Sequence, residues 1–373
     1  MIYIHIPYCH QKCTYCAFYS SPTRRDRQPY VDALCLELAS RSSEQAHPIR
    51  TVYLGGGTPS LLPIGQLAQI VDSLRLHFDL SALQEATLEA NPEDLTDNYL
   101  QQLAQLHFFN RISIGIQSFR DSDLRQLNRR HSAHEAILAV QRAHQHGFRN
   151  ISVDLIYGLP YQSLSDWKSN LATLDTILPF ITHLSCYALT IEEGTMLHTQ
   201  IAQSALAPAD EDTVLAHYQA LQDWIARHDW QHYEISSYCR PNFQSRHNSR
   251  YWDSTPYLGI GAGAHSFDGT HRRWNASNIQ SYIEGILSHT PYFEQETLTP
   301  SDRYNEYLMT ALRTAQGISL AHIRDQFPWA EQHLQQHVQR YLGTFLITHS
   351  DRLVPTPEGL LHADGIAAEL FAE

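Results

Sequence analysis

The sequence lacks the features that mark membrane, secreted and nucleic-acid-binding proteins. No apolar stretch reaches the roughly 20 residues that cross a bilayer. The N-terminus carries neither a basic region nor a small-residue cleavage site. The chain has 26 Lys and Arg against 39 Asp and Glu, so its net charge of −13 gives no general attraction to nucleic acid or to an anionic membrane. We therefore expect a soluble, cytoplasmic protein with no transmembrane segment and no nucleic-acid partner.

Cysteine is scarce, and its distribution is uneven. Six cysteines in 373 residues are too few for a disulfide scaffold. The composition, 43% hydrophobic and 17% charged, is that of a globular chain and excludes disorder, collagen and coiled coil. Three of the cysteines, Cys9, Cys13 and Cys16, lie together in one short segment. Such a cluster is a candidate ligand set.

Short β-rich runs alternate with amphipathic helical patterns up to about residue 190. This rhythm is typical of consecutive βα units that build a parallel sheet. The predicted strands span residues 2–6, 51–54, 86–89, 111–116, 151–156 and 184–189. The predicted crossover helices span residues 29–41, 64–78, 95–106, 133–146 and 164–178.

The segments that follow these strands carry the cysteine cluster, a glycine run at 55–57 and several polar residues. In parallel βα units such segments meet at one rim, where barrels of this kind place their chemistry. Six units do not complete the eight of a closed barrel. We therefore predict an α/β fold, a partial (β/α)6 TIM-like barrel with a wide lateral mouth and with the active site at that rim.

The rhythm ends at about residue 205, which divides the chain into three predicted parts. Residues 1–205 form the barrel, and 206–299 an irregular extension with one helix near 209–228. Residues 300–373 offer helices at 301–314, 320–326 and 331–342 and a hairpin at 345–355, which predicts a winged-helix-like α+β module. Because the module has few basic residues, we expect a structural or docking role rather than nucleic-acid reading.

The spacing of Cys9, Cys13 and Cys16 suits a cubane iron–sulfur cluster. Three thiolates bind three irons and leave the fourth iron open to another ligand. A zinc site is the alternative, with His5 or His10 as the fourth ligand. The remaining cysteines are interpreted as small buried hydrophobic residues: Cys35, Cys186 and Cys239.

The cysteine segment, with Tyr15 before its last cysteine, resembles that of the radical S-adenosylmethionine (SAM) enzymes. The run Gly55-Gly56-Gly57-Thr58-Pro59 after the second strand looks like their SAM-binding motif, and glycine lets the backbone approach a ligand closely. The resemblance implies a 4Fe-4S cluster whose open iron chelates SAM, with the protein binding and orienting the cofactors.

Further motifs resemble the oxygen-independent coproporphyrinogen III oxidase group. They are residues 3–7, 89–92, 111–119, 154–160 and 187–189 together with the glycine run. By this resemblance one set of residues contacts the cluster-bound SAM: Tyr3, Gly56, Glu89 and Arg129. A second set contacts another SAM or the shared pocket: Tyr15, Gly57, Thr58, Gln117, Asp154 and Ala188. The alternative is that these are strand-end polar residues that satisfy loops.

Three departures favour one branch of this group, the haem chaperones of the HemW type. Ala17 and Phe18 stand where the oxidase has a further cysteine, and the first strand begins without the oxidase's N-terminal extension. Residues 247–252 match the His-Asn-x-x-Tyr-Trp motif of the chaperones, and 259–266 also look like that branch. His265 could crowd or alter the pocket of a second SAM.

This branch implies a radical SAM protein that carries haem, or another tetrapyrrole, as cargo to haem-requiring respiratory enzymes. His247 is then a candidate haem ligand beside aromatic residues, and the alternative is a motif that locks the extension onto the barrel. Implied partners are haem-accepting proteins, an electron donor such as a flavodoxin and a membrane-bound recipient approached peripherally. The alternative functions are those of a coproporphyrinogen III oxidase and of a radical SAM enzyme with another substrate.

Overall fold

The computed structural model describes residues 1–22, 26–45 and 47–372. Its centre is a run of parallel strands that follow one another along the chain and along the sheet. They are β1 (Ile2–Ile6), β2 (Thr51–Gly56), β3 (Glu85–Ala90), β4 (Arg111–Gln117), β5 (Asn150–Tyr157) and β6 (His183–Ala188). The predicted strands and their parallel pairing are confirmed, with ends that shift by one or two residues.

Alternation along each strand divides its side chains between two environments. In β1, Ile2, Ile4 and Ile6 are fully buried in the main hydrophobic core. Tyr3 and His5, on the other face, point into the barrel, and their polar atoms hydrogen bond to each other. The core therefore lies between sheet and helices, while the interior of the barrel is polar.

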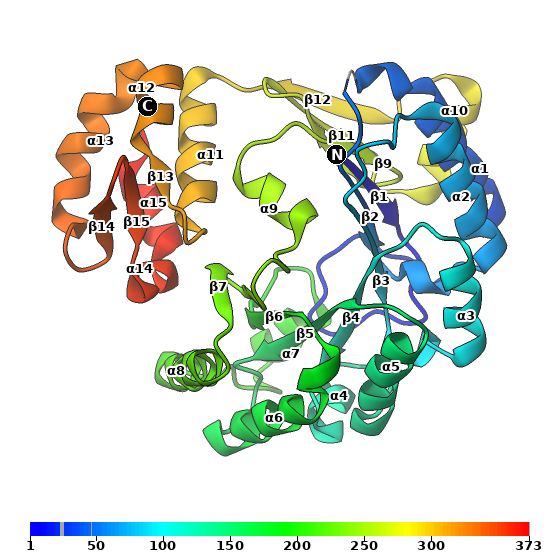
Figure 1. Cartoon of the computed structure of the whole chain (residues 1–373), viewed down its shortest axis with the longest axis horizontal. Coiled ribbons are helices and arrows are strands. Elements are labelled where there is room, and N and C mark those ends of the chain that lie inside the picture. Colours follow the sequence, from blue (N-terminus) through cyan, green and yellow to red (C-terminus); the bar gives the residue numbers. More distant parts are fainter. Residues whose placement is uncertain (23–25, 46, 373) are drawn as a thin grey trace.

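Helices cover the outer side of this sheet, as Figure 1 shows along its right and lower edges. Six helices bury an apolar face in the same core as the strands. They are α1 (Arg27–Ser40), α2 (Ile64–His77), α3 (Asp97–Gln105), α5 (Ala133–Gln145), α6 (Leu164–Ile177) and α8 (Glu211–Arg227). The short helices α4 (Asp121–Gln126) and α7 (Met196–Ala202) follow β4 and β6.

The segment expected to be an irregular extension instead adds strands to both edges of the sheet. β9 (Leu258–Ile260) pairs parallel with β1, and β8 (Ser237–Cys239) pairs antiparallel with β6 and with β7 (Gln231–Glu234). The sheet becomes nine-stranded, in the order β7-β8-β6-β5-β4-β3-β2-β1-β9. These strands of three and four residues are too short for an alternation pattern to show in the sequence. They pair with backbone N–H and C=O groups that β1 and β6 would otherwise leave unpaired at the sheet edges.

The rest of the extension forms a small antiparallel sheet and two helices. β10 (His265–Phe267), β11 (His271–Asn275) and β12 (Phe293–Thr297) pair in that order, and α10 (Ile279–Ser288) packs against α1. α9 (Arg246–Trp252) lies between the barrel and the C-terminal module in Figure 1.

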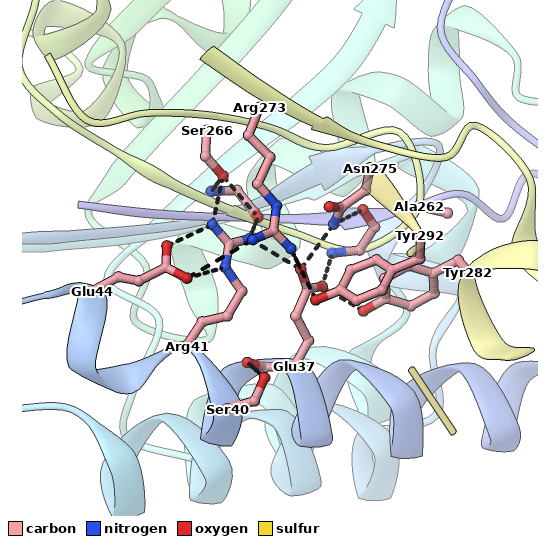
Figure 2. Close-up of polar contacts among 12 residues, drawn as sticks. Glu37, Ser40, Arg41, Glu44, Ala262, Ser266, Arg273, Asn275, Tyr282 and Tyr292 are labelled. Carbon is pink, nitrogen blue, oxygen red and sulfur yellow. Dashed lines mark hydrogen bonds and ion pairs between the residues drawn. The ribbon is translucent and has the colours of Figure 1, made fainter. Parts of the chain in front are cut away.

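A buried carboxylate fastens this extension to the barrel. Glu37 of α1 is fully buried and lies 3.0 Å from an Arg41 nitrogen. It also accepts hydrogen bonds from the Gly261 N–H, the Asn275 side chain and the Tyr282 hydroxyl at 2.9, 2.9 and 2.6 Å. Figure 2 shows Arg41, just past the end of α1, Asn275 of β11 and Tyr282 of α10 pointing toward Glu37.

The C-terminal part has its own hydrophobic core. It runs α11 (Pro300–Leu312), β13 (Ile318–Ser319), α12 (Leu320–Gln326), α13 (Glu331–His337), β14 (Leu346–His349), β15 (Arg352–Pro355), α14 (Pro357–Leu361) and α15 (Ala363–Leu370). β15 pairs with both β13 and β14, so a three-stranded antiparallel sheet packs with these helices as a winged-helix-like module. Within the described residues, no helix is long and apolar enough to cross a membrane.

We predict that Glu37→Ala lowers the free energy of unfolding by about 3–5 kcal/mol, because it leaves Arg41 and the Tyr282 hydroxyl without their buried acceptor. Urea unfolding followed by circular dichroism measures this loss. Glu44→Ala is the control: Glu44 bonds the same arginine but is 45% exposed, so its loss stays below about 1 kcal/mol. Equal losses for the two variants would contradict the assignment.

Candidate functional site

A cavity of about 610 Å³ opens at the carboxyl ends of the parallel strands, within the usual size range of ligand sites. The cysteine segment after β1 forms one wall, and the carboxyl-terminal parts of β2 to β6, with the segments after β2, β3, α4 and β6, form the others. The strand direction therefore brings together at one rim segments that are far apart in the sequence.

The cysteine loop is anchored at both ends and in its middle. The Cys9 N–H donates to the Ser21 carbonyl, and the Thr14 N–H donates to the Leu127 carbonyl after α4. The Cys16 N–H closes a tight turn on the Cys13 carbonyl. All three sulfurs belong to partly exposed residues that line the cavity.

Hydrogen-bond donors surround two of these sulfurs. The Thr58 hydroxyl lies 3.5 Å from the Cys9 sulfur, and an Arg129 nitrogen lies 3.4 Å from the Cys13 sulfur. Burial raises the pKa of the Cys9 and Cys16 thiols, so thiolate formation needs a nearby positive charge. A metal cluster or the Arg129 guanidinium supplies that charge.

The geometry of the loop bears on the kind of metal it can hold. In the described residues, no group of three or more His, Cys, Asp and Glu side chains is placed to hold a single metal ion. Both His5 ring nitrogens are already engaged, by the Tyr3 hydroxyl and the Tyr19 carbonyl. A cubane cluster takes one cysteine at each of three irons and does not need the sulfurs to meet, so the residues fit that group.

The glycine run brings bare backbone to the cavity wall. Gly56 has φ +106°, and a Cβ there would lie 2.4 Å from the His5 ring, so no other residue fits without displacement. Its N–H donates to Glu89 at 3.1 Å, and the Tyr53 hydroxyl donates to the other Glu89 oxygen at 2.6 Å. Glu89 is thereby fixed at the end of β3, facing the cavity.

Two partly buried carboxyl groups face the cavity with raised pKa values. Burial raises the pKa of Glu89 to about 7, and the neighbouring Asp154 adds to the shift. Burial also raises the pKa of Asp154, against hydrogen bonds from Ser185 and Ser113. At neutral pH the Glu89 carboxyl is poised between its charged and neutral forms, so a cationic or hydroxyl ligand would shift its proton occupancy.

Nearly all the residues singled out in the sequence meet at this cavity. Tyr3 and His247 are the exceptions, and both lie outside its lining. The residues that line it are Cys9, Cys13, Tyr15, Cys16, Gly56, Gly57, Thr58, Glu89, Gln117, Arg129, Asp154 and Ala188.

Tyr3 lies one layer below, stacked on Tyr53 with ring centroids 6.2 Å apart. Because the Tyr53 hydroxyl holds Glu89, Tyr3 supports the site through that neighbour.

His247 lies at the opposite end of the strands from the cavity. The two ring nitrogens of His247 hydrogen bond to the Thr51 hydroxyl at the start of β2 (3.0 Å) and to the Tyr251 hydroxyl (3.2 Å). The backbone N–H of His247 donates to the Glu85 carboxylate at the start of β3. The side chain is fully buried, and burial lowers its pKa well below the usual value. With both ring nitrogens engaged, this arrangement favours the lock between extension and barrel over a haem ligand.

The sequence reasoning missed Asn91, which connects two walls of the cavity. Its amide donates to the Thr58 hydroxyl at 3.2 Å, and its oxygen accepts from Arg129 at 2.7 Å. The signal was present, because Asn91 directly follows the third predicted strand at the rim.

Comparison with known proteins agrees with this geometry. The sequence model of the Radical SAM superfamily matches residues 3–174, and that of the HemN C-terminal domain matches residues 298–362. The solved structure of coproporphyrinogen III oxidase from Escherichia coli superposes with a TM-score of 0.85, covering 100% of this chain and 89% of that one. Its sequence identity is 21%, so this match shows the fold alone.

Curated relatives match over most of their length. The heme chaperone HemW of Lactococcus lactis is 33% identical, covering 87% of this chain and 84% of that protein. The one from Mycobacterium tuberculosis is 33% identical over 99% of this chain and 94% of that protein, and the one from Escherichia coli is 37% identical over 71% and 69%.

Fold, cysteine loop and comparisons together define a radical SAM protein. Within that superfamily, the chain belongs to the HemW family.

We predict that the Glu89 proton makes stability depend on pH. Between the unperturbed pKa of 4.5 and the folded value of about 7, the folded state holds a proton that the unfolded state releases. Stability from this group is therefore full below pH 4.5 and is lost as the pH rises through about 7, at up to about 1.4 kcal/mol per pH unit.

Glu89→Gln removes this titration and keeps a group of the same shape. Urea unfolding of both proteins at several pH values gives the difference in free energy, wild type minus variant, which should fall steadily from pH 5 to pH 7. A difference that stays constant or rises across this window would show that Glu89 is already ionised in the folded protein.

Proposed function

We propose that the chain is a haem chaperone that binds a 4Fe-4S cluster, SAM and haem and passes haem to haem-requiring proteins. The observation that carries the proposal is the relationship, at 30% identity or above, to proteins named heme chaperone HemW over most of the chain. The cavity at the strand ends supports it, because the cysteine loop and the glycine run line one space.

Cys9, Cys13 and Cys16 would hold the cluster. When bound, a cluster with one open iron coordinates the amino and carboxylate groups of SAM and can donate an electron to it. The donors at Thr58 and Arg129 stabilise negative charge on the sulfurs. The loop anchors described above keep the three cysteines on one wall.

The remaining rim residues would bind and orient SAM. The bare backbone of Gly56 and Gly57 allows close approach of its amino-acid part, and the Glu89 and Asp154 carboxyl groups can accept from its amino group or ribose hydroxyls. Arg129 is already engaged by Cys13 and Asn91, so it acts by holding the loop and by setting the charge around the ligand.

Haem is the proposed cargo, and its recipients would be haem-requiring enzymes such as those of respiration. An electron donor such as a flavodoxin would reduce the cluster. The proposal also includes a cytoplasmic location and a peripheral approach to a membrane-bound recipient. The TM-score to the oxidase reflects shared fold and does not favour decarboxylase activity.

The test combines two anaerobic measurements on cluster-reconstituted protein. Haem titration followed by absorbance should give saturable binding at one haem per chain. Incubation with SAM, reductant and coproporphyrinogen III, followed by mass spectrometry, should give no decarboxylated product while a known oxidase in parallel does. Product over many turnovers, or absence of saturable haem binding, would contradict the proposal.

We predict that Cys13→Ala abolishes cluster assembly, because one iron of the cluster loses its ligand. Iron and sulfide analysis after anaerobic reconstitution should show near-complete loss of both. Cys35→Ala is the matched control, since Cys35 lies in α1 away from the cavity lining, and it should retain the wild-type content. An intact cluster in Cys13→Ala would remove this cysteine from the ligand set.

A further inference from the structure

Two cationic side chains lie at the cavity mouth. Lys12, one of two lysines in the chain, and Arg130 both line the cavity and are exposed. In the part of the chain that the structure describes, neither side chain has a hydrogen-bond or ion-pair partner. The proposed binding of cluster and SAM uses neither of them, so their charges are available at the entrance.

Hydrogen bonds hold the two cations on the same side of the mouth. The Gln11 side chain donates to the Asn128 carbonyl at 2.9 Å, and the Asn128 side chain donates back to the Lys12 carbonyl at 2.8 Å. The cysteine loop thus rests on the turn that leads through Asn128 to Arg130. These contacts bring Lys12 and Arg130 to the same part of the mouth, although the two residues are far apart in the sequence.

An exposed aromatic residue lies on the same loop. Phe18 is 69% exposed although it follows Cys16 by only two residues, and it lines the cavity. Tyr187, at the end of β6 on another wall, is 43% exposed. Large apolar rings held open at a cavity are typical of a surface that a flat apolar ligand covers.

We propose that Lys12 and Arg130 bind the two propionate carboxylates of haem at the cavity mouth, with Phe18 against the macrocycle. Haem combines a flat apolar ring with two carboxylates at one edge, and the mouth offers the complementary groups. Arg and Lys are the usual partners of carboxylates. This assignment rests on the proposed haem-binding function and adds the location and orientation of the cargo.

The test compares haem with its dimethyl ester, which keeps the ring and iron but has no propionate charge. Both are titrated in the same detergent-containing buffer into the reconstituted wild type and into the Lys12→Gln/Arg130→Gln double variant. The wild type should prefer haem, and the double variant should bind haem about tenfold more weakly and the ester unchanged. Higher salt should reduce the wild-type preference, because exposed charge pairs are screened.

Two further variants make the result specific. Lys168→Gln/Arg227→Gln removes one lysine and one arginine from outside the cavity lining and should leave both affinities as in the wild type. Phe18→Ala should weaken haem and ester by the same factor, since its contact is with the ring. Circular dichroism confirms that each variant is folded.

Equal affinity of wild type and double variant for haem would overturn the assignment, and so would an equal loss of haem and ester in the double variant. Absence of saturable haem binding by the wild type is a different outcome, because it refutes the proposed function itself. The two failures are therefore distinguishable.

Discussion

One hydrogen-bonded chain holds the functional rim together, and its centre is the partly buried Arg129 side chain. Arg129 contacts the Cys13 sulfur on one side and the Asn91 oxygen on the other, and Asn91 continues through the Thr58 hydroxyl to the Cys9 sulfur. The cysteine loop and the segments after β2, β3 and α4 are thereby fixed to one another. Burying a cation is costly unless its acceptors are in place, so the guanidinium and the loop geometry depend on each other.

The polar interior of the barrel follows from the alternation of side chains. In β1 and β3 the residues that face the helices are apolar, whereas the interior face carries Tyr3, His5, Thr87 and Glu89. Tyr3 and His5 hydrogen bond to each other, and Glu89 accepts from the Tyr53 hydroxyl and the Gly56 N–H. Burial raises the pKa of Glu89. The outer face of the sheet is therefore apolar and the interior face polar. The protonation of an interior carboxyl group such as Glu89 then depends on what binds at the rim.

The central βα units could be predicted from the sequence because their signals are local. Strand alternation, amphipathic helices and the cysteine and glycine motifs each lie within a few consecutive residues, and parallel strands then bring them to one rim. The pairing of Leu258–Ile260 with β1 could not be predicted, because it joins segments far apart and the strand is only three residues long. The position of His247 could likewise not be predicted from the sequence, because its partners Thr51 and Glu85 come from two different strands.

We propose that this radical SAM fold serves to hand over haem. The most direct test is stopped-flow transfer under anaerobic conditions, in which haem-loaded protein is mixed with the apo form of a haem-requiring respiratory enzyme and the haem absorption band is followed. If the protein hands over haem, transfer to that enzyme is faster than haem release to a passive scavenger such as apomyoglobin. Transfer at the same rate to both, or retention of haem by the protein, would contradict this proposal.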